Sequence, residues 1–187
     1  MKNWTFFLAA VLLCTAVMAQ APAGVSVKTN IYFIRHAEKE TGNDPVLTQN
    51  GKKRAGDLVR TLKNKNVKRV YVTQFRRTQM TADSMRLQLG IDTVHYQADE
   101  NGVDLFNKIA AHHDFGKTIL IIGHSNTIPD YIKKAGVINY PQTAIPDGEF
   151  DNIYKVYYRR PFLFSPFKAH VKHSKYGAAS SASARMQ

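Results

Sequence analysis

The fold is decided by residues 118–126, which read Thr-Ile-Leu-Ile-Ile-Gly-His-Ser-Asn. Four consecutive large aliphatic residues followed by glycine are typical of a strand that is buried on both faces of a parallel sheet. A second β-rich stretch, residues 27–34, is followed directly by Arg35 and His36. Each of the two stretches therefore leads into a histidine close behind the end of a buried strand.

Strand-like and helix-like segments alternate on both sides of this stretch. The predicted strands span residues 27–34, 70–73, 93–96, 118–122 and 153–158, and the predicted helices span residues 51–62, 78–89, 103–111 and 128–135. Such alternation implies right-handed crossovers between parallel strands. The sequence predicts one α/β domain over residues 25–158, a three-layer sandwich with a mainly parallel central sheet and helices on both faces.

Composition supports a single globular domain with a strong positive charge. The chain has 187 residues, of which 44% are hydrophobic and 21% are charged. This excludes a disordered polypeptide for most of its length. Lys and Arg number 26 against 14 Asp and Glu, a net charge of +12. Polyanions are natural partners for such a chain, although solubility alone would also explain the charge.

The first residues resemble a targeting segment. Lys2 precedes an apolar run over residues 6–19, and small residues follow that run. The run is too short for an ordinary membrane-spanning helix and has the length of a signal-peptide core. Residues 1–19 are therefore interpreted as a cleaved signal peptide, with cleavage after Ala19 preferred to cleavage after Ala21, and the protein as exported, either periplasmic or secreted.

The cysteine content agrees with export. The single cysteine, Cys14, lies inside the predicted signal peptide. A mature chain without cysteine has no disulfide, no thiol nucleophile and no thiolate metal site, and it suits an oxidising compartment.

The C-terminal residues 159–187 are basic, and the last of them include few large hydrophobic side chains. They contain no acidic residue and six cationic ones, namely Arg159, Arg160, Lys168, Lys172, Lys175 and Arg185. One interpretation is a solvated, flexible extension. The other is a tether that binds a polyanion or an anionic lipid.

Polar residues at the predicted strand ends indicate the chemistry. In an open α/β sheet, sites form in the loops beyond the carboxyl ends of the strands. Arg35 and His36, then Arg77, then His124 stand at three such ends. Guanidinium groups match phosphate oxygens with paired hydrogen bonds, and a neutral histidine can attack phosphorus. No cofactor is expected, and neither is a metal, because the pairs His112/His113 and His170/His173 lack further ligands in sequence.

These motifs resemble those of the histidine phosphatase superfamily, also called phosphoglycerate-mutase-like. The resemblance rests on Arg-His-Ala-Glu at 35–38, Leu-Thr-Gln-Asn-Gly at 47–51, Phe-Arg-Arg-Thr-Gln-Met-Thr-Ala at 75–82 and Gly-His-Ser-Asn at 123–126. Their form looks most like small exported members of bacterial origin. Two positions depart from the usual pattern: Ala37 replaces a glycine, and Thr73 replaces a common serine while keeping the hydroxyl.

The resemblance implies a metal-independent phosphatase in which His36 is transiently phosphorylated. Arg35, Arg77 and His124 would form the phosphate pocket, and Thr48 is expected to help bind the substrate. The acid that protonates the leaving group is open. Glu100 is preferred from its position after the third predicted strand, with Asp99, Asp147 and Glu38 as alternatives, since the acid must reach the ester oxygen.

The expected substrates are phosphomonoesters, or phosphohistidine, on a small molecule or on an exposed part of a polymer. About twenty-five residues separate the second helix from the strand at 118, so little chain remains for a lid. The alternative to an enzyme is a catalytically weak phosphate- or polyanion-binding module of the same fold.

Overall fold

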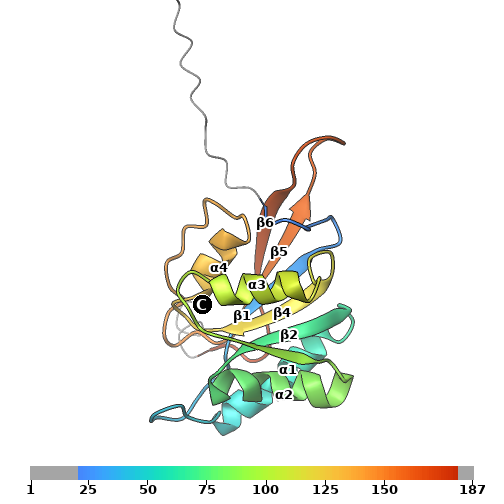
Figure 1. The fold of residues 1–187 in the computed structure, drawn as a ribbon. Coiled ribbons are helices and arrows are strands. Elements are labelled where there is room, and N and C mark those ends of the chain that lie inside the picture. Colours follow the sequence, from blue (N-terminus) through green and yellow to red (C-terminus); the bar gives the residue numbers. More distant parts are fainter. Residues whose placement is uncertain (1–20, 181–187) are drawn as a thin grey trace, which may run out of the picture.

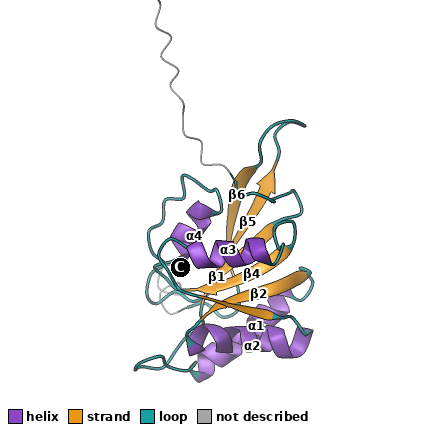
Figure 2. Ribbon diagram, in the orientation of Figure 1, coloured by secondary structure: helices purple, strands orange, loops and turns teal. Residues whose placement is uncertain are grey.

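The computed structural model describes residues 21–180, which form a six-stranded sheet with helices on both faces (Figures 1 and 2). The strands are β1 (Asn30–Arg35), β2 (Val67–Thr73), β3 (Thr93–Tyr96), β4 (Thr118–Gly123), β5 (Asn152–Arg159) and β6 (Lys168–Lys175). The helices are α1 (Gln49–Leu62), α2 (Arg76–Leu89), α3 (Val103–Ala111) and α4 (Ile128–Lys134). The strand order is β3-β2-β4-β1-β5-β6.

The sheet is parallel from β3 to β1 and antiparallel beyond it. β1 pairs with β4, and β2 with β4 and β3, all in parallel. β5 runs antiparallel to β1, and β6 antiparallel to β5. The predicted fold class is therefore confirmed. Because the four parallel strands end at the same edge, the loops after β1, β2 and β4 meet there.

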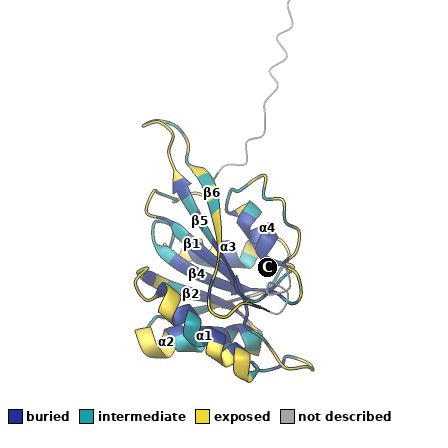
Figure 3. Cartoon of the chain, turned by 180° about the vertical axis from the view of Figure 1, so that it is seen from behind, coloured by how far each residue is buried: buried dark blue, intermediate teal, exposed yellow. Residues whose placement is uncertain are grey.

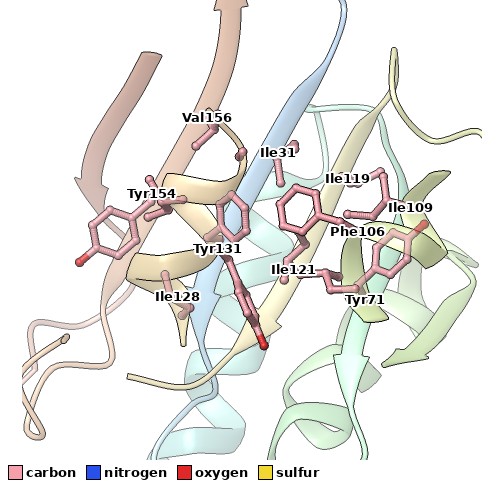
Figure 4. Close-up of a cluster of buried hydrophobic side chains, with 14 of the residues drawn as sticks. Ile31, Tyr71, Phe106, Ile109, Ile119, Ile121, Ile128, Tyr131, Tyr154 and Val156 are labelled. Atoms are coloured by element: carbon pink, nitrogen blue, oxygen red, sulfur yellow. The ribbon is translucent and has the colours of Figure 1, made fainter. Parts of the chain in front are cut away.

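Two hydrophobic clusters hold the layers together. Side chains of α3 and α4 pack on one face of the sheet, where Phe106 and Tyr131 lie against strand residues such as Ile121 (Figure 4). Side chains of α1 and α2, among them Leu58 and Met85, cover the other face. The central strands are dark, that is buried, in Figure 3, whereas the outward sides of α1 and α2 are exposed. The apolar strand β4 is buried as its sequence predicts, because helices cover both of its faces.

Helix α1 is fixed against the segment that follows β1. The Thr48 hydroxyl accepts a hydrogen bond from the Gly51 N–H over 3.0 Å and so caps the helix. At Gly51 a Cβ atom would lie 2.1 Å from the carbonyl oxygen of Glu38, so only glycine fits. This close approach holds the start of α1 against the loop that carries His36 and Glu38.

The C-terminal part of the described chain corrects one prediction. Residues 159–187 were expected to form a flexible extension, but Lys168–Lys175 form β6, whose eight residues all pair with β5. Tyr176 and Ser180 are buried. Only two apolar residues, Ala169 and Val171, alternate with the lysines and histidines of β6, which is a weak strand signal, and the strand forms by pairing with β5. The domain therefore extends to residue 180.

Other boundaries shift by only a few residues from those predicted. The predicted signal peptide at 1–19, with Cys14, lies outside the described residues, as does Arg185. Within residues 21–180, no helix is both long and apolar enough to cross a bilayer.

Candidate active site

Side chains from three strand ends meet at the carboxyl edge of the sheet. His36 follows β1, Arg77 lies in the first turn of α2 directly after β2, and His124 follows β4. The rings of His36 and His124 lie edge to face with their centroids 5.4 Å apart. Nη2 of Arg77 lies 3.5 Å from Nδ1 of His124. The structure therefore brings together the two histidines and the arginine that the sequence placed at separate strand ends.

His36 is held in one tautomer. Its Nδ1 lies 2.8 Å from the carbonyl oxygen of Ala37, and a carbonyl only accepts hydrogen bonds. Nδ1 must therefore carry the proton when the ring is neutral, and Nε2 keeps its lone pair. Ala37 is itself fixed, because its N–H donates to the Thr81 hydroxyl over 3.0 Å. The result is a buried imidazole with a free basic nitrogen.

Both histidines are neutral near pH 7. Burial, together with the positive fields of Arg35 and Arg77 and the neighbouring His124, lowers the pKa of His36 to about 3. Burial and the same two guanidinium groups lower the pKa of His124 to about 4. A cluster of two buried histidines and two arginines would be strongly repulsive if all four were charged. Keeping the rings neutral relieves that repulsion.

A chain of hydroxyl groups orients His124. The Thr73 hydroxyl oxygen lies 3.2 Å from Nε2 of His124 and 2.9 Å from the Thr78 hydroxyl oxygen. The Thr78 hydroxyl donates to the carbonyl oxygen of Phe75 over 2.8 Å. The Thr73 hydroxyl can then donate to Thr78 and accept from His124, so the proton of the neutral His124 ring sits on Nε2. Nδ1, which faces Arg77, is left as an acceptor.

Arg35 is clamped beside His36 by backbone and aromatic groups. Its Nη1 lies 2.8 Å from the carbonyl oxygen of Asp147 and 3.1 Å from that of Pro146. Its guanidinium carbon lies 4.3 Å from the centre of the Phe150 ring, a cation–π contact. The Phe150 ring also lies 6.1 Å from the His36 ring, centroid to centroid. Burial lowers the pKa of Arg35, although not far enough to discharge a guanidinium.

Arg77 is held in a similar way. Its guanidinium carbon lies 4.2 Å from the centre of the Phe75 ring, and Nη1 lies 3.6 Å from an oxygen of the Asp44 carboxylate. Within residues 21–180, Nε of Arg77 and Nε of Arg35 are both buried without a hydrogen-bond acceptor. Buried donors of this kind are rare and call for a partner. Two cationic groups with unpaired N–H donors beside a neutral histidine suit an oxyanion.

Two of the four candidate acids are committed elsewhere. The Glu38 carboxylate accepts hydrogen bonds from Nε and Nη2 of Arg54 over 2.7–2.9 Å. The Asp99 carboxylate accepts from the N–H groups of Val103 and Asp104 and so caps α3. Both carboxylates therefore make structural contacts, one with a guanidinium group and one with the start of a helix.

Glu100 and Asp147 have exposed side chains. Glu100 lies in the turn after β3, and within the part of the chain that the structure describes it makes no hydrogen bond or ion pair. The fully exposed Asp147 carboxylate lies 3.8 Å from Nη2 of Arg35. Because Asp147 lies near Arg35, it is the better candidate for the acid that protonates the leaving group.

The contacts of Thr48 are structural, whereas the sequence predicted that this residue helps to bind the substrate. Its hydroxyl accepts from Gly51 and lies 3.4 Å from the carbonyl oxygen of Glu38. These contacts are those of a helix cap, and they support the loop behind His36.

Sequence reasoning missed the residues that reach the site from a distance along the chain. Phe150 stacks on Arg35 from the loop before β5, and Asp44 binds Arg77 from the loop between β1 and α1. No strand end or motif marks either position. A cavity of about 400 Å³ is lined by Phe150 together with Glu38, Lys53, Arg54 and Ser180. Among residues 21–180, no three His, Cys, Asp or Glu side chains are grouped to hold a metal ion.

Comparison with known proteins agrees with this arrangement. Residues 31–101 match the family model described as histidine phosphatase superfamily (branch 1). That segment contains His36 and Arg77, while His124 lies beyond it. No curated protein sequence gives a significant match.

Solved structures show the same fold at low sequence identity. A mycobacterial glucosyl-3-phosphoglycerate phosphatase aligns with a TM-score of 0.57 and 12% identity over 80% of this chain and 99% of its own. A protein assigned as the phosphohistidine phosphatase SixA from Agrobacterium tumefaciens aligns with a TM-score of 0.53 and 16% identity, over 81% and 97%. Phosphoserine phosphatase from Entamoeba histolytica, in complex with 3-phosphoglyceric acid, gives 0.52 and 16%, over 81% and 98%.

Proposed function

We propose that this chain, which carries a histidine phosphatase match over residues 31–101 and the fold of the phosphatases above, is a phosphohydrolase that works through a phosphohistidine intermediate on His36. The observation that carries the proposal is the state of His36. Its Nδ1–H is bound to the Ala37 carbonyl, so Nε2 is a neutral nucleophile beside two guanidinium groups.

In the first step Nε2 of His36 attacks phosphorus. A P–N bond forms while the bond from phosphorus to the leaving oxygen breaks. Arg35 and Arg77 bind the phosphoryl oxygens through charge-assisted hydrogen bonds. Electrostatic stabilisation of spreading negative charge supplies most of the rate enhancement in phosphoryl transfer.

His124 takes part by gaining a proton. Its Nδ1 faces Arg77, while its Nε2–H is held by Thr73. A phosphate dianion entering the pocket raises the pKa of the nearby ring, since opposite charge favours the protonated form. The protonated Nδ1 then donates to a phosphoryl oxygen. Thr73 keeps the ring oriented throughout.

In the second step water attacks the phosphohistidine. The P–N bond breaks, Nε2 recovers its lone pair, and inorganic phosphate leaves. The proton given to the leaving group in the first step is replaced from this water, so one water is consumed for each ester cleaved. The acid that donates in the first step is the natural base for the second.

We assign that acid to an exposed carboxyl, Asp147 or Glu100. Glu38 and Asp99 are excluded on their contacts, with Arg54 and with the start of α3. Asp147 is favoured by its position 3.8 Å from Arg35. Removing the residue that acts as the acid will slow hydrolysis of an alkyl phosphate. It will affect an aryl phosphate much less, because the aryl leaving group is stable without protonation.

The substrate class follows from the small amount of chain around the rim. Only β3, α3 and short loops separate α2 from β4, so no long helical insertion stands at this point of the described chain. We propose phosphomonoesters or phosphohistidine on small molecules or exposed positions of larger ones. The apolar residues 6–19 behind Lys2 support export to the periplasm or beyond as part of the same proposal.

The test is hydrolysis of para-nitrophenyl phosphate from pH 4 to 8, in EDTA, by the chain beginning at Gln20. EDTA-resistant turnover that disappears in His36→Ala, and persists in a Lys52→Ala control, is expected. Retained turnover in His36→Ala would exclude the histidine nucleophile.

The second candidate function is a phosphate-binding module with weak catalysis. The observation in its favour is that no described carboxyl group is hydrogen-bonded to either histidine. Binding of vanadate without turnover of any ester or phosphoramidate would favour it.

A further inference from the structure

The β5–β6 hairpin ends in three apolar side chains that contact solvent. Phe162, Leu163 and Phe164 are 79%, 73% and 95% exposed. They lie in the loop between β5 and β6, which projects from one end of the sheet in Figure 1. Contiguous exposed aromatic and aliphatic residues are unusual on a soluble surface and mark interaction sites.

The loop is shaped so that these side chains stay outside. Nη1 of Arg160 donates to the carbonyl oxygen of Leu163 over 2.7 Å, and the Ser165 N–H donates to that of Phe162 over 3.0 Å. The guanidinium carbon of Arg160 lies 4.4 Å from the centre of the Phe167 ring, which packs against the core. Arg160 thus links the apolar tip to the domain.

Behind the tip, one face of the hairpin is a ladder of cations. In the β5–β6 register, Arg159 lies opposite Lys168 and Lys155 lies opposite Lys172. Residues directly opposite one another share a face, and like charges there destabilise a sheet. Between the two cationic pairs the Tyr157 and His170 rings stack with centroids 5.4 Å apart. Residues 152–187 contain no acidic residue to neutralise the ladder.

In the half of the hairpin nearer the tip, the opposite face is apolar. Val156, opposite Val171, and Tyr158, opposite Ala169, pack against the core. Four of the five lysines and arginines on the two strands therefore share one face, whereas Lys175, opposite Asn152, lies on the other. A cavity of about 260 Å³ opens on the cationic face, with Lys65, Lys155 and Lys172 in its lining. Burial and the charges of Lys65 and Lys172 lower the pKa of Lys155.

We propose that the β5–β6 hairpin docks on an anionic lipid bilayer, with Phe162, Leu163 and Phe164 in the interfacial layer and the cationic face against the headgroup phosphates. The apolar tip decides between a bilayer and a soluble polyanion. A polyphosphate or an acidic polysaccharide would pair with the ladder but would leave three large apolar side chains in water. A bilayer accommodates both features.

The topology gives the docked protein an orientation. β5 runs antiparallel to β1, with Ile153 opposite Ile34 and Tyr157 opposite Asn30. The tip therefore lies at the opposite end of the sheet from Arg35 and His36. A docked molecule turns its histidine pocket away from the membrane, toward soluble phosphorylated molecules.

The test is co-sedimentation with vesicles, of phosphatidylcholine alone or mixed with phosphatidylglycerol. The full chain and the chain beginning at Gln20 are both used, because residues 6–19 are apolar and would bind lipid themselves. Binding to the mixed vesicles is expected in the shorter form, and much less to phosphatidylcholine.

Two variants separate the two features. Phe162→Ser/Leu163→Ser/Phe164→Ser should weaken binding by about tenfold or more, whereas Leu87→Ser/Val103→Ser, at exposed apolar positions elsewhere, should not. Lys155→Gln/Lys172→Gln should weaken it by about fivefold for each lysine, and Lys39→Gln/Lys52→Gln should not. All four should keep wild-type melting temperatures and hydrolysis of a soluble ester.

The proposal is overturned if the tip variant binds mixed vesicles as the wild type does. It is also overturned if binding is equal with and without phosphatidylglycerol. Binding of soluble tripolyphosphate at the ladder, lost in Lys155→Gln/Lys172→Gln and unaccompanied by vesicle binding, would replace the bilayer with a soluble polyanion. Because the variants leave the histidine pocket intact, these results stand whether or not the phosphatase proposal holds.

Discussion

The hydroxyl oxygen of Thr73 lies 3.2 Å from Nε2 of His124, and this contact sets which nitrogen of the ring faces Arg77. Thr73 is at the end of β2 and fully buried, so its position is fixed by the sheet. It acts on the site through His124 and is a positioning residue.

Thr73→Val removes this hydrogen bond while keeping the shape of the side chain. The buried N–H of His124 is then unpaired, which costs about 1–3 kcal/mol and frees the ring to turn. We expect kcat to fall about tenfold or more with KM changed less. Thr73→Ser is the matched control and should retain most activity. Equal losses in both variants would argue against the role of the hydroxyl.

Phosphate binding should be accompanied by proton uptake. The pKa of His124 is about 4, so the ring is neutral at pH 6 before phosphate binds. A bound phosphate raises that pKa and recruits a proton from solvent. Calorimetric titration with phosphate at pH 6, in buffers that differ in ionisation enthalpy, measures the number of protons taken up. We expect uptake in the wild type and a smaller value in His124→Gln.

Without added phosphate, the protein should lose stability as the pH falls below about 6.5. The pKa values of His36 and His124 are about 3 and 4 in the folded chain, against about 6.5 unfolded, so the unfolded chain binds more protons in this range. The free energy of unfolding therefore falls with falling pH, by at most about 1.4 kcal/mol per pH unit for each histidine. Urea unfolding at pH 7, 6 and 5 tests this.

His36→Gln/His124→Gln should flatten that dependence between pH 6.5 and 5, where the carboxylates with lowered pKa remain ionised. Saturating phosphate should flatten it as well. An unchanged slope in the double variant would assign the dependence to other groups, of which His173, whose pKa is also lowered by burial, is the first to examine.

Ser180 connects the end of the described chain to the site. Its hydroxyl oxygen accepts hydrogen bonds from the N–H groups of Phe150 and Asp151, over 2.8 and 3.1 Å. Ser180→Ala leaves both donors in a buried place without this acceptor and should lower the free energy of unfolding by about 1–3 kcal/mol. Because Phe150 stacks on Arg35, we also expect a raised KM for the aryl phosphate. Ser180→Thr, which keeps the hydroxyl group, serves as the conservative control.

Gly51→Ala should be among the most damaging small substitutions. The added Cβ would lie 2.1 Å from the Glu38 carbonyl oxygen, so α1 or the loop behind His36 must move. We expect a loss of about 2 kcal/mol or more in the free energy of unfolding, measured by urea titration. Gly56→Ala, in the same helix, is the control, since there the nearest atom is the end of the Arg60 side chain at 3.6 Å and alanine favours a helix.

The sequence predicts the parts of this structure that depend on local pattern. The aliphatic run at 119–122, the helical spacing in α1 and the histidines after β1 and β4 all follow from periodicity and from the edge at which parallel strands end. The same reasoning brought Arg35, Arg77, His36 and His124 together, as the structure does.

What the sequence did not predict depends on contacts between distant segments. β6 is a strand because β5 pairs with it, not because of its own residues. Phe150 and Asp44 reach the two arginines from loops that no pattern marks. The ion pair between Arg54 and Glu38 also joins two separate segments, so the sequence alone does not exclude Glu38 as the acid.

The reversal of direction at β5 has an evolutionary consequence. Because the 160–167 loop and the histidine rim are at opposite ends of the sheet, changes of length or charge in that loop need not disturb the residues around His36. Selection can therefore adjust where such a protein resides separately from what it does. Among relatives with this architecture, we expect the loop to diversify while the rim stays constant, and a graft of residues 159–168 to carry its surface preference to another member.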